Sequence, residues 1–179
     1  MPHNAFPSAS SPWRQSPEDV TAHMHKFLDA RRFAVVGASP DPAKWGNKTL
    51  NVLLVLGKSV TPVNPKHREI LGVDCVPSIQ HLPDPSNTSI AIVTKPHVTL
   101  EILQEAKRTN VCFIWIQPGA QDASVIQAVF DLNLEDRCVF ELKERTMAAA
   151  DVAHSPTGNP VQVPVLNGIK VPSPKKRRG

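Results

Sequence analysis

Three small residues, Gly37, Ala38 and Ser39, follow the first strongly apolar run of the sequence. Gly37 lets the backbone bend sharply and approach a ligand, and Ser39 offers a hydroxyl and a backbone N–H. A helix is predicted a few residues later, and its free N–H groups, together with Lys44 just before it, would attract an anion such as a phosphate. A plain strand-to-helix connection is the alternative, because a single glycine turn is weak evidence for a phosphate site.

A cationic cluster follows the next predicted strand, where Asn64 and Pro65 lead into Lys66, His67 and Arg68. NAD-binding domains usually have an acidic residue here, which binds the ribose hydroxyls. The basic residues instead favour a phosphate on the ribose, which NADP carries on its 2′ oxygen and coenzyme A (CoA) on its 3′ oxygen. The residues alone do not separate these two cofactors, and a solvated basic loop is the plainer interpretation.

Small and polar residues also follow the third and fourth predicted strands. Ligands of open parallel sheets bind beyond the C-terminal ends of the strands, so all four strand ends are candidate contacts for one ligand. The two further sets are Thr94-Lys95-Pro96 and Gln117-Pro118-Gly119-Ala120.

Side chains suited to catalysis are poorly grouped. His97 lies at a strand end, where a polar helix-start residue is a more frequent role than a general base. His23 and His25, two residues apart on a predicted helix, face different sides and make a poor metal pair. We expect Cys112 to be buried inside a strand, and Cys138 to be structural although its basic neighbour would lower a thiol pKa. The sequence therefore leans towards a protein without a catalytic centre.

Alternating helices and strands are predicted to hold these residues. The apolar strands form continuous runs and the helices are amphipathic, which favours a parallel sheet covered on both faces. Right-handed crossovers then give an α/β, Rossmann-like three-layer fold with a mostly parallel sheet of about five strands. The predicted strands are 33–36, 59–63, 88–93, 111–116 and 137–140; one helix begins at Pro17 after the N-cap Ser16, and the others span 44–56, 98–109 and 122–132.

Composition divides the chain into one domain and two tails. We expect a disordered tail in 1–15, a Rossmann-like ligand-binding domain in 16–153 with an added helix after Cys138, and a disordered basic tail in 154–179. The formal net charge of the chain is +4. Residues 152–179 hold five basic residues and no acidic one, so the formal net charge of the rest of the chain is −1. The basic character therefore belongs to the tail rather than to the domain.

Residues 173–178 read Ser-Pro-Lys-Lys-Arg-Arg, which resembles a short nuclear import signal, so 174–178 is a candidate contact for an import receptor. A solubilising terminus is the alternative. No recognition helix or aromatic platform accompanies the charge, so specific nucleic-acid binding is not expected. The three cysteines form no CxxC pair, and no apolar run spans a membrane, which indicates a cytoplasmic protein with the nucleus as a further location.

Several motifs in order resemble the small CoA-binding protein family, which is similar to the N-terminal domain of the succinyl-CoA synthetase alpha subunit. The resemblance covers roughly residues 33–138. The motifs are Gly37-Ala38-Ser39, Lys44-Trp45-Gly46-Asn47-Lys48, Val63-Asn64-Pro65-Lys66, Ile70-Leu71-Gly72 leading to Pro77-Ser78, and Trp115-Ile116-Gln117-Pro118-Gly119-Ala120.

The resemblance implies a Rossmann-like fold that binds CoA through its ADP portion. It implies that the turn at 37–39 holds the diphosphate, that Lys44 approaches phosphate, and that Asn64 and Lys66 lie along the ribose and its 3′-phosphate. Relatives tend to have an Arg followed by prolines at the third strand end; Lys95 keeps that charge without the planar fork of Arg. The synthetase uses a phosphohistidine in a further domain, so the chain resembles the binding half without the ligase machinery.

Three functions remain open at this point. The first is a non-catalytic or regulatory module that binds CoA or an acyl-CoA, of unknown oligomeric state. The second is a small NADP-dependent oxidoreductase, although the chain contains no Tyr to act as a proton donor. The third is a nuclear interaction protein that uses the Rossmann-like core as a scaffold.

Overall fold

The computed structural model of the chain describes residues 15–140. Residues 1–14, the helix expected after Cys138 and the basic segment 174–178 lie outside the described residues. No helix in the described range is long and apolar enough to cross a membrane.

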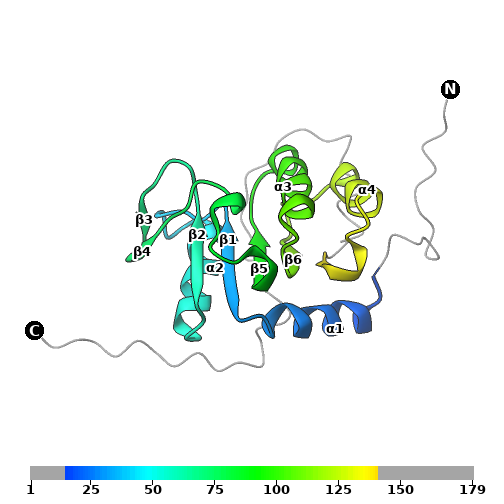
Figure 1. Ribbon diagram of the computed structural model, residues 1–179, viewed down its shortest axis with the longest axis horizontal. Helices are drawn as coiled ribbons and strands as arrows, with labels where there is room; N and C mark the ends of the chain where they lie inside the picture. Colours follow the sequence, from blue (N-terminus) through cyan, green and yellow to red (C-terminus); the bar gives the residue numbers. More distant parts are fainter. Residues whose placement is uncertain (1–14, 141–179) are drawn as a thin grey trace, which may run out of the picture.

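The core of the protein is a five-stranded sheet in which all neighbouring strands are parallel (Figure 1). The sheet confirms the predicted α/β, Rossmann-like architecture, and the strand order reverses direction between β1 and β5. Such a reversal opens a crevice at the C-terminal edge of a parallel sheet. The strands in spatial order are β2 (Val60–Val63), β1 (Arg32–Val36), β5 (Thr88–Ile92), β6 (Phe113–Ile116) and β7 (Cys138–Val139).

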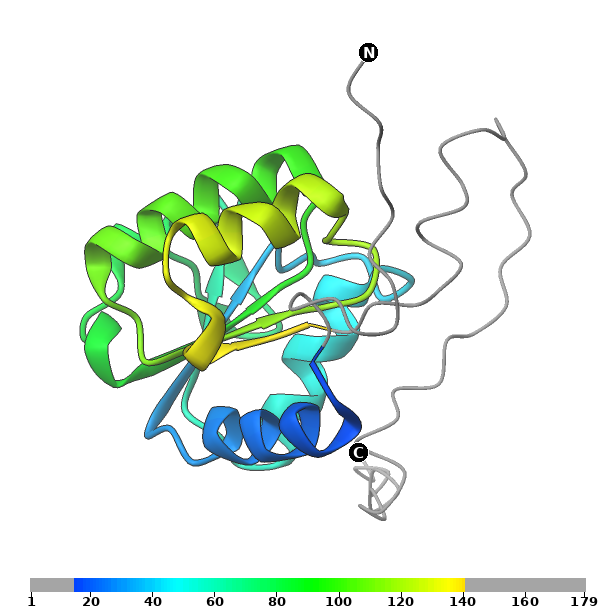
Figure 2. The same cartoon turned by 90° about the vertical axis from the view of Figure 1, so that its right-hand side faces the viewer.

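Helices cover both faces of the sheet (Figure 2). On one face a cluster that includes Phe27, Leu50 and Phe113 is buried, and on the other Ile90, Leu103 and further apolar residues are buried. The first face carries α1 (Pro17–Leu28) and α2 (Trp45–Val55), and the second carries α3 (Pro96–Thr109) and α4 (Ala123–Asp131). Short 3-10 helices lie in the connections between these elements: η1 (Ile79–His81), η2 (Pro85–Asn87) and η3 (Glu135–Arg137).

The start of α1 follows the predicted capping pattern. The Ser16 hydroxyl accepts from the N–H of Asp19 at 3.1 Å, and the Asp19 carboxylate accepts from the N–H of Ser16 at 3.1 Å, which forms a capping box. Just before it, the amide of Gln15 donates to the carbonyl oxygen of Cys138 at 2.7 Å. This contact ties the start of the described chain to the edge strand β7.

Several element boundaries differ from the predictions. Helix α3 begins at Pro96, two residues early, because proline fits the first helical position, where no N–H partner is needed. Strand β6 begins at Phe113 rather than at residue 111, and Cys112 is exposed, so its expected burial in a strand is wrong. The reason lies at Asn110, whose left-handed backbone (φ 53°) ends α3 and leaves two residues for the return to the sheet.

A small hairpin between β2 and η1 was not predicted. It consists of β3 (Glu69–Ile70) and β4 (Val73–Asp74), joined by Leu71 and Gly72. Both turn residues have positive φ, 53° and 76°, as two-residue hairpin turns require. A leucine is unusual at such a position, so Gly72 alone was too weak a turn signal to predict the hairpin.

Candidate functional site

The turn after β1 is built by a close approach of two backbones. Gly37 has a φ of 89°, and its N–H donates to Val63 of β2 at 3.1 Å. A side chain at this position would come within 2.9 Å of the Thr94 methyl carbon, at the end of β5. Glycine is therefore needed both for the backbone angle and for the space.

Helix α2 begins directly against this turn because its second residue is also a glycine. A Cβ on Gly46 would collide with the carbonyl oxygen of Gly37 and lie 3.1 Å from the Cα of Ala38. The first turn of α2 therefore lies in contact with the backbone at 37–38. Gly46 is part of the motif Lys44-Trp45-Gly46-Asn47-Lys48 but was not predicted to be a site residue. A glycine inside a predicted helix is the sequence signal that could have indicated this close contact.

Two asparagine side chains hold the carbonyl groups of the turn. The buried Asn47 donates to the carbonyl oxygen of Ser39 at 2.9 Å. Asn64, at the end of β2, donates to the carbonyl oxygen of Ala38 at 2.7 Å and accepts from the N–H of Lys66 at 2.8 Å. The carbonyls of Ala38 and Ser39 thus have partners inside the protein, whereas within residues 15–140 their N–H groups donate no hydrogen bond.

The N-terminus of α2 has no side-chain cap. Its N-cap is Lys44, whose exposed side chain makes no cap hydrogen bond, while its carbonyl oxygen accepts from the N–H groups of Asn47 and Lys48 at 3.1 and 3.2 Å. The first N–H groups of a helix lack intrahelical partners and carry partial positive charge, so an uncapped start favours an anion. Lys48, one turn later, lies with its ammonium 4.7 Å from the centre of the Trp45 ring.

The end of β2 carries exposed basic residues and no carboxylate. Pro65, Lys66, His67 and Arg68 are all exposed. The carbonyl oxygen of Arg68 accepts from the N–H of Cys75 at 2.7 Å, which anchors the base of the β3–β4 hairpin. The acidic residue that would bind ribose hydroxyls in an NAD site is therefore missing from this strand end.

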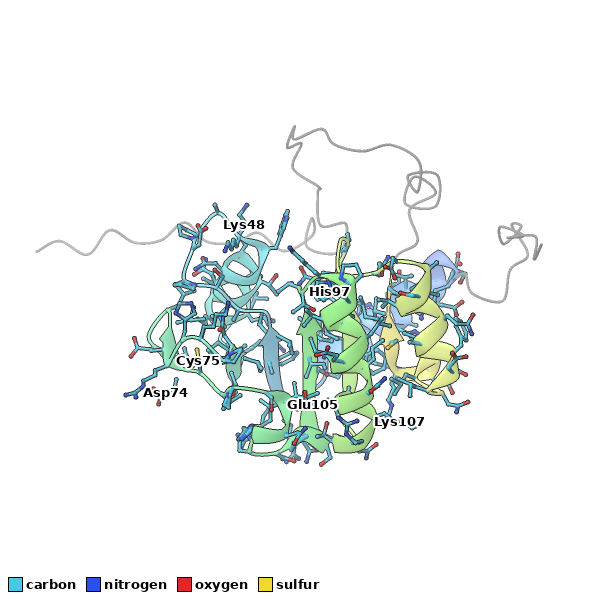
Figure 3. The ribbon with its side chains drawn as sticks, turned by 90° about the horizontal axis from the view of Figure 1, so that it is seen from above. Lys48, Asp74, Cys75, His97, Glu105 and Lys107 are labelled. Atoms are coloured by element: carbon cyan, nitrogen blue, oxygen red, sulfur yellow. The ribbon has the colours of Figure 1, made fainter. Side chains whose placement is uncertain are left out.

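The end of β5 leads into a second uncapped helix. Lys95 is the N-cap of α3 and its side chain makes no cap hydrogen bond; Pro96 takes the first helical position. The hydroxyl of Thr94 is 2.9 Å from that of Thr99, which is buried. Figure 3 shows Lys48 of α2 and His97 of α3 at the same end of the molecule, away from Glu105 and Lys107.

The end of β6 differs from the other strand ends, because its polar side chains form hydrogen bonds within the protein. The amide of Gln117, only 7% exposed, donates to the hydroxyl of Thr49 in α2 at 2.9 Å. Pro118 and Gly119 are exposed, and α4 then begins at a capped N-terminus. The cap is Asp122, whose carboxylate accepts from the N–H of Val125 at 3.0 Å.

The structure thus brings the four predicted strand ends together at one edge of the sheet, since β2, β1, β5 and β6 are neighbours in that order. The turn after β1, Asn64 and Thr94 are in direct contact through the hydrogen bonds and close approaches above. Gln117 is joined to α2 instead, through Thr49. Lys44, Lys66 and Lys95 are exposed around this edge, against one exposed carboxylate in the turn after β1, that of Asp41, which accepts from the N–H of Ala43 at 2.9 Å. The lysines therefore outnumber the acidic residue there.

Of the candidate catalytic residues, His97 lies at this edge in the first turn of α3, whereas the two cysteines lie elsewhere. Cys112 donates its backbone N–H to Thr88, the first residue of β5, and so lies at the opposite edge of the sheet. Burial raises the pKa of the Cys138 thiol, and the opposing effect of Arg137 is smaller. Within the described residues, no three His, Cys, Asp or Glu side chains are grouped as metal ligands.

Comparisons with known proteins agree with this geometry. A family model described as a CoA binding domain matches residues 31–142. The acetate–CoA ligase (ADP-forming) I of Archaeoglobus fulgidus is 33% identical over 113 residues, which is 62% of this chain and 16% of the ligase. The chain therefore spans less than a fifth of that relative.

Solved structures show the same fold. A conserved hypothetical protein from Pyrococcus furiosus is 38% identical, with a TM-score of 0.53 over 57% of this chain and 88% of its own. A hypothetical protein from Pyrococcus horikoshii is 27% identical, with a TM-score of 0.58 over 76% and 88% of the two chains.

Proposed function

Because the chain belongs to the CoA-binding domain family, we propose that it binds coenzyme A at the C-terminal edge of its sheet, as a module without catalytic machinery of its own. The diphosphate would lie at the turn after β1, and the 3′-phosphate at the end of β2.

The uncapped start of α2 supports this proposal best. Within the described chain no partner accepts from the N–H groups at positions 38 and 39 or from the first two N–H groups of α2, at positions 45 and 46, while the neighbouring carbonyls are held by Asn47 and Asn64. Such a set of donors is suited to a diphosphate. Lys44 adds a full positive charge beside it.

The end of β2 supports a phosphate on the ribose. Lys66 is exposed, and its backbone is fixed by the hydrogen bond to Asn64. Exposed His67 and Arg68 add to the positive charge, and no carboxylate competes at Asn64, the position from which NAD sites bind ribose hydroxyls.

A role without catalysis is supported by what surrounds the site. Cys138 is buried, Cys112 lies at the opposite edge, and His97 is an exposed residue in the first turn of α3. None of these side chains has a partner that would activate it at the proposed ligand edge among the described residues. The ligase activity named for the relatives is therefore not part of the proposal.

Calorimetric titration of the full chain with CoA, dephospho-CoA, NADP and NAD tests the proposal. We expect CoA to bind most tightly. The variant Lys66→Ala should weaken CoA binding by roughly 10- to 100-fold, since a hydrogen bond to a charged group contributes about 1.5–3 kcal/mol, and should leave dephospho-CoA almost unchanged.

A matched control is Lys107→Ala, which removes an exposed lysine near the other end of α3 (Figure 3). It should change neither affinity. A preference for NADP, or no binding of any of the four ligands, would contradict the proposal. Equal losses for CoA and dephospho-CoA in Lys66→Ala would show that Lys66 does not contact the 3′-phosphate.

A further inference from the structure

An apolar groove runs between α1 and α2, over the face of the sheet. Met24 and Phe27 of α1, Val52 and Leu56 of α2 and Trp115 of β6 are among its walls. The space in it that the centre of a water-sized sphere can occupy is about 80 Å³. One water needs roughly 10–15 Å³ of such space, so the groove has room for a short alkyl chain.

The exposed surface of the groove is entirely apolar. The polar side chains in its walls are turned to other partners, since Thr49 and Gln117 hydrogen-bond to each other at 2.9 Å and the Lys48 ammonium lies over the Trp45 ring. Phe27 meets Trp115 edge to face, with ring centres 5.6 Å apart. A polar ligand would find no partner here, so the occupant that fits is a hydrocarbon.

One end of the groove coincides with the proposed diphosphate site. Trp45, which lines the groove, is the first residue of α2, and Gln117, which also lines it, directly follows β6 at the C-terminal edge of the sheet. The lining then continues along α2 to its C-cap, Leu56, about 16 Å away at 1.5 Å per residue. A chain attached to a ligand at this edge can therefore enter the groove from its mouth.

We propose that this groove binds the acyl chain of an acyl-CoA, which would make the protein selective for CoA thioesters with alkyl chains over free CoA. The inference rests on the proposed CoA binding. The pantetheine arm carries amides and suits the polar edge of the sheet, whereas an alkyl chain suits walls that offer no hydrogen bonds.

The test is the affinity of the full chain for CoA and for acetyl-, butanoyl-, hexanoyl- and octanoyl-CoA. Each buried methylene should tighten binding by roughly fourfold until the groove is full, since burial of one CH₂ contributes about 0.8 kcal/mol. An affinity that does not change with chain length, in a protein that binds CoA, would overturn this inference and leave the proposed function intact. Failure to bind CoA at all would remove both.

A pair of variants on one helix locates the chain. Val52→Trp fills the groove and should remove the dependence on chain length while keeping the affinity for CoA. Val55→Trp makes the same change at a valine that is 51% exposed and does not line the groove, and it should keep the dependence. Equal effects of the two variants would show that the alkyl chain binds elsewhere. A dependence on chain length that survives Val52→Trp would likewise overturn the inference.

Discussion

Two strand-to-helix turns at the same edge of the sheet differ in whether a side chain caps the N-terminus of the helix that follows. After β6, the N-cap of α4 is Asp122, whose carboxylate accepts from the N–H of Val125 and from the hydroxyl of Ser124. After β1, the N-cap of α2 is Lys44, whose side chain makes no cap hydrogen bond. One helix start therefore contains its own anion, and the other has a cation beside free donors.

The difference indicates which turn can accept a ligand anion. A carboxylate at the N-cap both satisfies the free N–H groups and offsets the helix dipole, so an external phosphate gains little there. An uncapped start leaves that stabilisation to be supplied by a ligand. The stabilisation that an N-cap side chain would give α2 is absent from the free protein, and a bound anion would supply it as part of its binding free energy.

The largest expected effect comes from closing the open turn sterically. In Gly46→Ala the new Cβ collides with the carbonyl oxygen of Gly37, so α2 must move away from the turn. We expect a loss of about 1–3 kcal/mol of stability from overpacking. CoA affinity should fall by roughly a hundredfold or more, because at least two charge-assisted contacts are lost. Chemical denaturation and calorimetry measure the two quantities.

Gly57→Ala is the matched control, since Gly57 follows the other end of α2. Its positive φ of 69° makes alanine unfavourable by about 1–2 kcal/mol, but nothing lies within 4 Å of the new Cβ. The control should lose stability and keep its affinity for CoA. If both variants lose affinity in proportion to stability, contact between Gly46 and the turn has no special role in binding.

A smaller effect is expected from giving α2 the cap that α4 has. Lys44→Asp introduces a carboxylate at an N-cap with extended backbone, which should add about 0.5–1 kcal/mol of stability. The same change removes a positive charge and fills the anion position, so CoA affinity should fall by roughly tenfold or more. A variant that is more stable and binds CoA as before would contradict the comparison.

The reciprocal variant is Asp122→Ala. It should cost about 1 kcal/mol of stability and leave CoA affinity unchanged, because the cap belongs to the turn after β6.

The smallest effect is a pH dependence of the capped turn. Burial raises the pKa of Asp122, but the hydrogen bonds from Ser124 and Val125 outweigh it and hold the pKa below its ordinary value of 3.8. A lowered pKa in the folded state means that the carboxylate stabilises the fold above that value and loses its contribution as the pH falls through the folded pKa. The stability difference between the unaltered protein and Asp122→Ala should therefore shrink below about pH 3.8. A constant difference down to lower pH would contradict the assignment of the cap.

Periodicity and strand-end residues predicted the fold and the edge of the sheet on which the candidate site lies. The apolar runs and the cap at Ser16 are local signals, and both were confirmed. The family was also predicted correctly, because its motifs are short and stand in order. Which of the residues contact CoA stays a prediction.

The contacts that shape the site were less accessible from the sequence. Gly46 matters because it packs against the backbone of the turn after β1. Asn47 and Asn64 matter because they donate to carbonyl oxygens 7 to 26 positions away in the chain. Cys112 was predicted wrongly because its apolar neighbours suggested a strand that starts two residues later. The apolar groove depends on how α1 lies beside α2, which no local pattern specifies.

Asn64 has a consequence for selectivity. Its single amide group joins the carbonyl oxygen of Ala38, in the turn after β1, to the backbone N–H of Lys66, at the end of β2. The two proposed phosphate positions are thereby kept at a fixed separation. The site would then measure the distance between a ligand's phosphates, and a dinucleotide with correct charges at the wrong spacing would satisfy only one of them.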